Sequence, residues 1–335
     1  MVFLSHAGTQ RISGGLGHQF GLWGEAAVDV FFVVSGFVIA QAAVGRTASD
    51  YATARVARLA SVVVPCLLLG WLLDAAGPAL GPQVYAAAPG FQGAAGAGQI
   101  LSSLLFLDHL WFRAAQPGSN LPFWSLCFEA WYYLAFGLLL FLPRPWNALG
   151  AAAALLAAGP KIALLAPLWG LGVACRHLCA RGGVPRRLGW VLLAAPLALL
   201  LWAPGERLCF PYSAFTWEAR CLAELGHDYA VGGLFALQIL GVHALAPVLW
   251  PALRRIARPV AWLAGASFTL YLLHYPLLHF LAAASPWAAA HWGTRALVFL
   301  LPPLAALALA AATERRRDAW RRAVAMVIGG RHARG

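Results

Sequence analysis

Long apolar runs separated by short polar segments dominate the pattern of positions along this chain. The helix-sized runs cover 26–44, 59–77, 99–112, 124–142, 162–178, 189–203, 228–250, 260–281 and 293–313. A helix needs about 20 mostly apolar residues to cross a bilayer, and most of these runs approach that length. With a short apolar segment at 1–8, the pattern predicts an all-α, polytopic transmembrane helical bundle of about ten spans.

The segment at 1–8 departs from this pattern because it is short. It reads MVFLSHAG, whereas a complete span needs about 20 residues. We therefore expect the first helix to be truncated, with His6 near its outer end. An imidazole titrates near neutral pH, which makes His6 a candidate for proton transfer.

A weaker apolar segment at 146–158 leaves two topologies open. If it lies outside the bilayer, the run 99–112 crosses the membrane and Arg113 lies on the basic side. If it crosses instead, 99–112 is re-entrant, and Arg113 and Arg144 exchange sides. Most of the 24 Lys and Arg residues fall on one side in both arrangements. The positive-inside rule makes that side cytoplasmic, together with the C-terminus.

Composition strengthens the membrane assignment. The chain is 61% hydrophobic and 11% charged, whereas soluble domains carry about 25% charged residues. A net charge of +12 suggests nucleic acid in a soluble protein, but basic cytoplasmic loops explain it here, so we expect no nucleic-acid partner. The basic tail at 314–335 follows a membrane domain at 1–313 and carries Trp320. It is typical of an interfacial helix on anionic membrane lipids.

The cysteines do not predict a metal site. Cys175 and Cys179 flank His177 at helical spacing, which supplies fewer ligands than a zinc site needs. Cys209 and Cys221 lie in one polar loop and are candidates for a disulfide if that loop faces an oxidising compartment.

Two acids and a serine interrupt the run that begins near residue 26. Glu25 and Asp29 are four residues apart and share a helix face, and Ser35 with Gly36 follows. Ionisable groups inside a span are costly, which makes them functional candidates. The alternative is helix packing through the small residues, with the acids as structural groups.

Two arginines directly precede the next run. Arg55 and Arg58 in RVAR are three residues apart, so they share a helix face. They either fix topology and contact lipid headgroups, or form a fork for phosphate groups, since arginine gives bidentate, charge-assisted hydrogen bonds.

An aromatic-rich stretch surrounds Glu129. Trp124, Ser125 and Tyr132 lie near this carboxylate in LPFWSLCFEAWYYLAF. Such a group can orient a sugar or a histidine, but Trp and Tyr also form belts at membrane interfaces.

A polar stripe runs through the stretch GASFTLYLLHYPLLHF. Ser267, Tyr271 and His274 recur after four and three residues, so they share one helix face. A polar stripe does not face lipid, which leaves a partner helix or a cavity.

These stretches together resemble acyltransferase family three, integral membrane enzymes that O-acylate surface carbohydrates and related acceptors. The resemblance is carried by five elements in the family order: FLSHAG, AAVDVFFVVSGFVI, RVAR, WSLCFEAWYY and SFTLYLLHYP. They extend over nearly the whole chain. Two departures are the lack of an arginine upstream of His6 and a proline delayed to Pro65.

The resemblance implies a reaction and its participants. The donor is expected to be cytoplasmic acyl-CoA, most commonly acetyl-CoA, with no permanently bound cofactor and no metal. The acceptor is expected to be an extracytoplasmic or lipid-linked carbohydrate, at the bacterial inner membrane. Arg55 and Arg58 would bind the CoA phosphates, and His6 would act as base, oriented by Asp29 or Glu129. The expected cavity residues are Ser35, Trp124, Ser125, Tyr132, Ser267, Tyr271 and His274.

Two other interpretations stay open. A secondary transporter also places charges at mid-membrane, although it favours an internal repeat, and none is evident. An N-terminally truncated, inactive family member is the other. An acyltransferase releases free CoA from acyl-CoA, whereas a transporter leaves the thioester intact.

Overall fold

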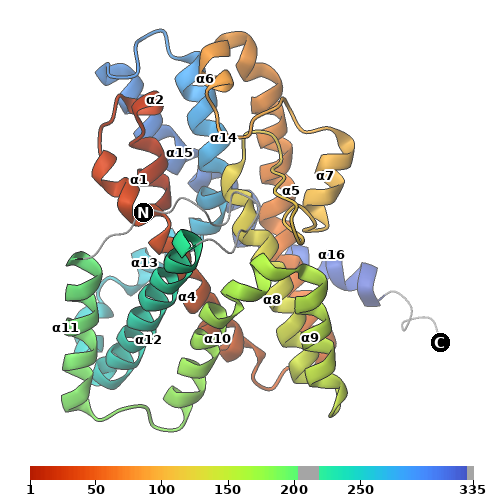
Figure 1. Ribbon diagram of the computed structural model, residues 1–335, viewed down its shortest axis with the longest axis vertical. Helices are drawn as coiled ribbons and strands as arrows, with labels where there is room; N and C mark the ends of the chain where they lie inside the picture. The colour runs from red at the N-terminus through yellow and green to blue at the C-terminus, as the bar shows by residue number, and fades with distance from the viewer. Residues whose placement is uncertain (203–218, 330–335) are drawn as a thin grey trace.

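The computed structural model describes residues 1–202 and 219–329, which form helices and connecting loops without a strand (Figure 1). The longer helices in chain order are α4 (Ala26–Ala43), α5 (Ala48–Leu80), α7 (Ala97–Leu104), α8 (Trp124–Phe141), α9 (Trp146–Ala158), α10 (Pro160–Ala180), α11 (Arg186–Trp202), α12 (Ala219–Leu253), α13 (Ala257–Ala264), α14 (Ser267–Ala284), α15 (Trp292–Ala312) and α16 (Arg317–Gly329). The expected all-α membrane bundle is confirmed. Within the described ranges, seven helices are long and apolar enough to cross a membrane.

Two short helices at the N-terminus, α1 (Val2–Ala7) and α2 (Gln10–Ser13), pack against α14 and α15. Helix α3 (Gly21–Gly24) contacts α1 and α4, and α6 (Pro82–Ala86) contacts α5 and α14. Figure 1 shows α1 and α2 beside α14 and α15. Segments far apart in the sequence are therefore neighbours in space.

The predicted helix at 99–112 is wrong in extent, because α7 ends at Leu104. The hydroxyls of Ser102 and Ser103 both donate to the carboxylate of Asp108, each over 2.6 Å. Phe106, which lies between the two serines and Asp108 in the chain, adopts a positive φ of 56°. The chain therefore turns around this buried carboxylate, and apolar character alone does not reveal that turn.

The loop after α7 returns to the end of the bundle where α5 finishes. The backbone N–H and hydroxyl of Ser119 donate to Asp74 of α5, both over 2.7 Å. The N–H of Trp111 donates to the carbonyl of Ala158 at the end of α9 over 3.0 Å. The start of α8 and the end of α9 thus lie at one end, so α9 runs antiparallel to α8. The second of the two predicted arrangements requires an antiparallel α9, and the path of the chain through the membrane stays a prediction.

Two further helix limits differ from the sequence pattern. The predicted helix at 260–281 is interrupted at Gly265, between α13 and α14. Helix α5 begins at Ala48 rather than 59, because the Thr47 hydroxyl accepts a hydrogen bond from the N–H of Asp50 over 3.1 Å. A side chain that caps the first turn extends the helix into a polar sequence.

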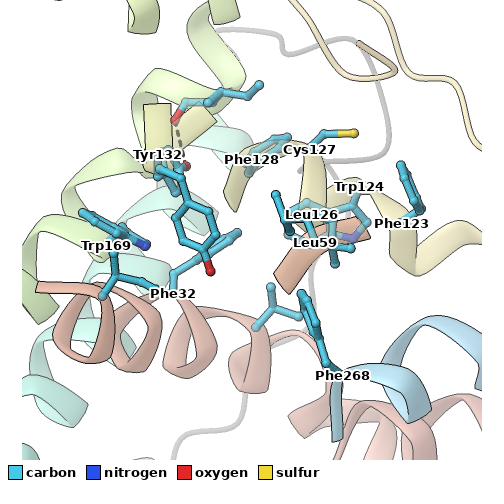
Figure 2. Packing of buried hydrophobic residues seen from close by; sticks show 14 of the residues in the cluster. Phe32, Leu59, Phe123, Trp124, Leu126, Cys127, Phe128, Tyr132, Trp169 and Phe268 are labelled. Carbon is cyan, nitrogen blue, oxygen red and sulfur yellow. Dashed lines mark hydrogen bonds between the residues drawn. The ribbon is translucent and has the colours of Figure 1, made fainter. Parts of the chain in front are cut away.

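The core lies between α4, α8 and α10 and is built from aromatic rings. Phe32 of α4 packs against Phe128 and Tyr132 of α8, with ring centroids 6.3 and 5.6 Å apart. Trp169 of α10 lies 6.2 Å from Tyr132 (Figure 2). Aromatic rings bury large areas and favour edge-to-face contacts, so they fix these helices in position.

Candidate functional site

A cavity of about 220 Å³ surrounds His6 at the end of α1. Its walls come from α1, the loop before α4, and the first turns of α8 and α14. Glu25, Trp124 and Tyr271 are among its lining residues. The fold thus brings together residues from both halves of the sequence, and three predicted site residues share this cavity: His6, Trp124 and Tyr271.

His6 is paired with His274 of α14. His6 Nδ1 lies 2.9 Å from His274 Nε2, and the ring planes are inclined by 9°. His274 Nδ1 lies 3.0 Å from the carbonyl oxygen of Leu270. Because a carbonyl only accepts, His274 carries its proton on Nδ1 and leaves Nε2 as an acceptor. His6 therefore donates from Nδ1, and its Nε2 keeps the lone pair that a general base needs.

Tyr271 is fixed in the wall of the His6 cavity. Its hydroxyl donates to the carbonyl of Pro122 over 3.1 Å and accepts from the hydroxyl of Ser125 over 2.8 Å. These bonds attach α14 to the start of α8. Ser125 itself is fully buried, so it acts on the cavity through Tyr271.

A second cavity, of about 630 Å³, lies between α4, α5, α8 and α16. We call it the arginine cavity. Its cationic lining residues are Arg46, Arg55, Arg58, Arg315, Arg317 and Arg321. The acids at the same surface are Asp50, Glu129 and Asp318. Cavities of 300–1,000 Å³ accommodate small-molecule ligands.

Aromatic rings hold the two predicted arginines. The guanidinium carbon of Arg55 lies 5.8 Å from the ring centre of Tyr51 and 5.7 Å from that of Tyr133. The corresponding distance from Arg58 to Phe268 is 5.1 Å. Cation–π contacts at this range restrict the side chains without using their N–H donors. Among the described residues the buried Nε of Arg55 has no hydrogen-bond partner, so this donor is available to an anion.

Glu129 belongs to the arginine cavity. Its Oε1 accepts hydrogen bonds from the hydroxyls of Tyr133 and Ser35, the latter over 2.7 Å. Trp169 Nε1 donates to Ser35 Oγ over 3.2 Å. Glu129 Oε2 and Arg55 Nε are buried and have no hydrogen-bond partner in the described part of the chain. Buried polar atoms of this kind need an explanation, and a ligand in this cavity supplies one.

The two acids expected to orient His6 lie elsewhere. Glu129 bonds to Ser35 and Tyr133, and His6 bonds to His274. Asp29 is fully buried near the start of α4 and is not among the lining residues of either cavity. His274 thus occupies the position beside His6 in which the sequence suggested an orienting carboxylate.

A third cavity, of about 310 Å³, lies between the other two. It shares Tyr271 and Val28 with the His6 cavity, and Phe31 and Arg58 with the arginine cavity. Ser267 lines it as well. The three hollows therefore form a row that runs from the arginines to His6.

Tyr132 does not line any of the three cavities. Its hydroxyl donates to the carbonyl of Ile162 over 2.8 Å, and its ring is buried in the aromatic core (Figure 2). The predicted cavity role of Tyr132 is therefore not supported by its position. The side chain joins α8 to α10.

The predictions about cysteine concern two pairs. Cys175 and Cys179 are free and buried. Cys209 and the side chain of Cys221 lie outside the described residues. Across residues 1–202 and 219–329, no group of three or more His, Cys, Asp or Glu side chains is arranged to hold a metal ion.

The sequence did not identify Arg315, Arg317 and Arg321 as residues of the arginine cavity. The sequence predicts a membrane-surface helix for this tail, because an arginine run with a tryptophan is typical of an interfacial helix. The spacing of Arg317 and Arg321, four residues apart on one helix face, is the signal that points to a common target.

Comparison with protein families matches residues 1–313 to the acyltransferase domain of family three. Neither the curated proteins nor the solved structures include a match to this chain. The matched range contains His6, the arginine pair and the aromatic stretch around Glu129.

Proposed function

Since the chain belongs to acyltransferase family three and is a membrane acyltransferase, we propose that it transfers an acyl group from acyl-CoA to a hydroxyl of a carbohydrate. The acyl group is acetyl, and the acceptor is extracytoplasmic or lipid-linked. The observation that carries the proposal is the presence, in one bundle, of an arginine cavity and a paired histidine.

The arginine cavity is the proposed donor site. Coenzyme A carries a diphosphate and a further phosphate, and guanidinium groups bind phosphates through bidentate hydrogen bonds. Rings hold Arg55 and Arg58 from the side, and the buried Nε of Arg55 has no hydrogen-bond partner among the described residues. The basic end of the bundle is the cytoplasmic one by the positive-inside rule, and the cytoplasm supplies acyl-CoA.

His6 is the proposed general base. The acceptor oxygen bonds to the acyl carbon while the carbon–sulfur bond of the thioester breaks. The hydroxyl proton moves to Nε2 of His6 and then to the departing thiolate, which leaves as free CoA. The hydrogen bond to His274 supports this role, since it leaves Nε2 unprotonated. The row of cavities supports passage of the acyl group between the two sites.

The experiment that tests the proposal compares O-acyl signals in proton NMR spectra of cell-surface glycans. A deletion strain is complemented with the intact gene, with His6→Ala or with His18→Ala. His18 is exposed at the same end of the bundle and is the matched control. We expect the signal with the intact gene and with His18→Ala. His6→Ala should lose it, because removing a general base lowers rates about 10²–10⁴-fold.

Membrane levels of the three proteins must be equal for this comparison. A signal that returns with His6→Ala would show that His6 is not the base. If deletion of the gene changed no glycan, the carbohydrate acceptor would be wrong.

A further inference from the structure

The tail helix α16 forms one wall of the arginine cavity. Arg317 and Arg321 are four residues apart on one face of this helix, and both line the cavity with Arg55 and Arg58 of α5. Helices α5 and α16 are in direct contact. The neighbouring Arg316 and Arg322 are not among the lining residues. Arg317 is exposed and Arg321 is partly buried, so the tail presents two of its arginines at the open side of the cavity.

Buried contacts hold the tail in this position. Glu314 is only 4% exposed, and its Oε2 accepts from the N–H and the hydroxyl of Thr269, over 3.2 and 3.0 Å. Arg315 donates to the carbonyl of Trp262 over 2.9 Å, and its guanidinium stacks on the Trp262 ring at 4.2 Å. These bonds attach the start of the tail to α13 and α14. Contacts with α13 and α14 thus fix the position of α16. A helix held only by membrane lipid would not need these contacts.

The charge of the arginine cavity exceeds what its own acids neutralise. Six arginines face three acids there, and Glu129 already accepts two hydrogen bonds from hydroxyls. Like charges repel across a shared hollow, so this arrangement is stabilised by an anion of several charges. Phosphate groups in close succession have that charge, whereas a single carboxylate does not.

We propose that Arg317 and Arg321 bind phosphate groups of the donor nucleotide, so that α16 completes the donor site. This inference rests on the proposed function, because acyl-CoA is the polyphosphate that the reaction supplies. Phosphate is also the chemistry of an anionic lipid headgroup, and the experiment must separate the two sources. Neither arginine lies within the range matched by the acyltransferase family.

Binding of radiolabelled acetyl-CoA to the full chain in lipid nanodiscs tests the inference. The variant Arg317→Ala/Arg321→Ala is compared with the control Arg316→Ala/Arg322→Ala, which removes the same charge from the same part of the tail. Each protein is measured in neutral phosphatidylcholine discs and in discs that contain phosphatidylglycerol. We expect the first variant to weaken binding about tenfold or more in both lipids, because charge-assisted hydrogen bonds are lost. The control should bind as the unaltered chain does.

A second ligand tests whether the phosphate groups account for the loss of binding. S-acetylpantetheine lacks the nucleotide and its phosphates, so its affinity should be the same for all three proteins. Equal losses in both double variants would assign the effect to net charge and overturn the inference. So would a loss confined to anionic discs, which would assign the arginines to lipid headgroups.

The inference and the proposed function fail in different ways. If the unaltered chain bound acetyl-CoA and Arg317→Ala/Arg321→Ala bound it equally well, only the role of the tail would be wrong. If the unaltered chain bound no acetyl-CoA in either lipid, the proposed donor would be wrong as well.

Discussion

The hydrogen bond between His6 and His274 is the most specific feature at the scale of single residues. With both rings neutral, each nitrogen that donates faces an acceptor. Leu270 O determines the tautomer of His274, and His274 determines that of His6. A backbone carbonyl of α14 thus controls which nitrogen of His6 is basic.

His274→Ala should lower the rate of acyl transfer by about fivefold, less than His6→Ala does. Loss of one neutral hydrogen bond costs about 1 kcal/mol, and the tautomer of His6 is then no longer fixed. We expect the double variant His6→Ala/His274→Ala to be no slower than His6→Ala. Initial rates of CoA release in membranes with equal protein content measure this.

An additive loss in the double variant would contradict the positioning role of His274, since residues that act through one another are not additive. A pH–rate profile adds a second test. His274→Ala should move the lower limb of the profile, whereas a variant that only disturbs folding lowers the plateau.

The sequence predicted part of the candidate site and missed part of it. Helical spacing predicts that Ser267, Tyr271 and His274 share one face; Ser267 and Tyr271 line the third cavity, whereas His274 is buried beside His6. The contact between His6 and His274 joins residues 268 positions apart, and spacing carries no information at that range. The assignment of Tyr132 to a cavity failed for a similar reason. Its neighbours in sequence gave no sign that its hydroxyl bonds to α10.

At the scale of helices, α4 and α10 approach closely because glycine lies at their contact. A Cβ atom built on Gly172 of α10 would overlap the carbonyl oxygen of Val33. One built on Gly36 of α4 would overlap the carbonyl oxygen of Trp169. Small residues let backbones meet in this way in membrane bundles. The contact holds Ser35 beside Glu129.

Gly172→Ala should destabilise the protein, and Gly170→Ala should not. Both positions lie on α10, but a Cβ at Gly170 meets no atom within 4 Å. Overpacking costs about 1–3 kcal/mol, whereas alanine at an open helix position is favoured by about 1 kcal/mol over glycine. Thermal unfolding in detergent should show a lower midpoint for Gly172→Ala alone. Equal midpoints would contradict the close contact.

Helix limits were predictable where apolar runs end at polar residues and not where a side chain redirects the backbone. The pattern located α4, α8 and α15 within a residue or two. It failed at α7, where Asp108 captures two serine hydroxyls, and between α13 and α14. The failure at α7 depends on hydrogen bonds that hydropathy does not encode.

For the whole molecule, the two ends of the bundle differ in chemistry. The arginine cavity lies near the start of α5, and Asp74 near the end of α5 bonds to the loop that carries Ser119. Because α9 runs antiparallel to α8, Ala94 in the loop before α7 and Ala148 in the first turn of α9 lie at opposite ends of the bundle. The positive-inside rule then predicts that Ala148 is cytoplasmic and Ala94 is not.

Ala94→Cys should react with a membrane-impermeant maleimide added to intact spheroplasts, and Ala148→Cys should react only after the membrane is permeabilised. Both positions are exposed, and the six native cysteines must be replaced first. Reaction of both variants in intact spheroplasts would instead support the first predicted arrangement, in which 99–112 crosses the membrane. Reaction of Ala148→Cys alone in intact spheroplasts would invert the orientation of the bundle.

The position of α16 beside the arginine cavity has a consequence for how such chains diverge. The family match ends at residue 313, and the two cavity arginines of α16 lie beyond it. Substitutions in the tail therefore alter the lining of the cavity while the five sequence elements stay intact. Two chains can match the family equally well and differ in the ligand that this cavity accepts. Classification by the shared domain does not detect that difference. Selection for a particular ligand would instead be seen as differences in the sequence of the tail.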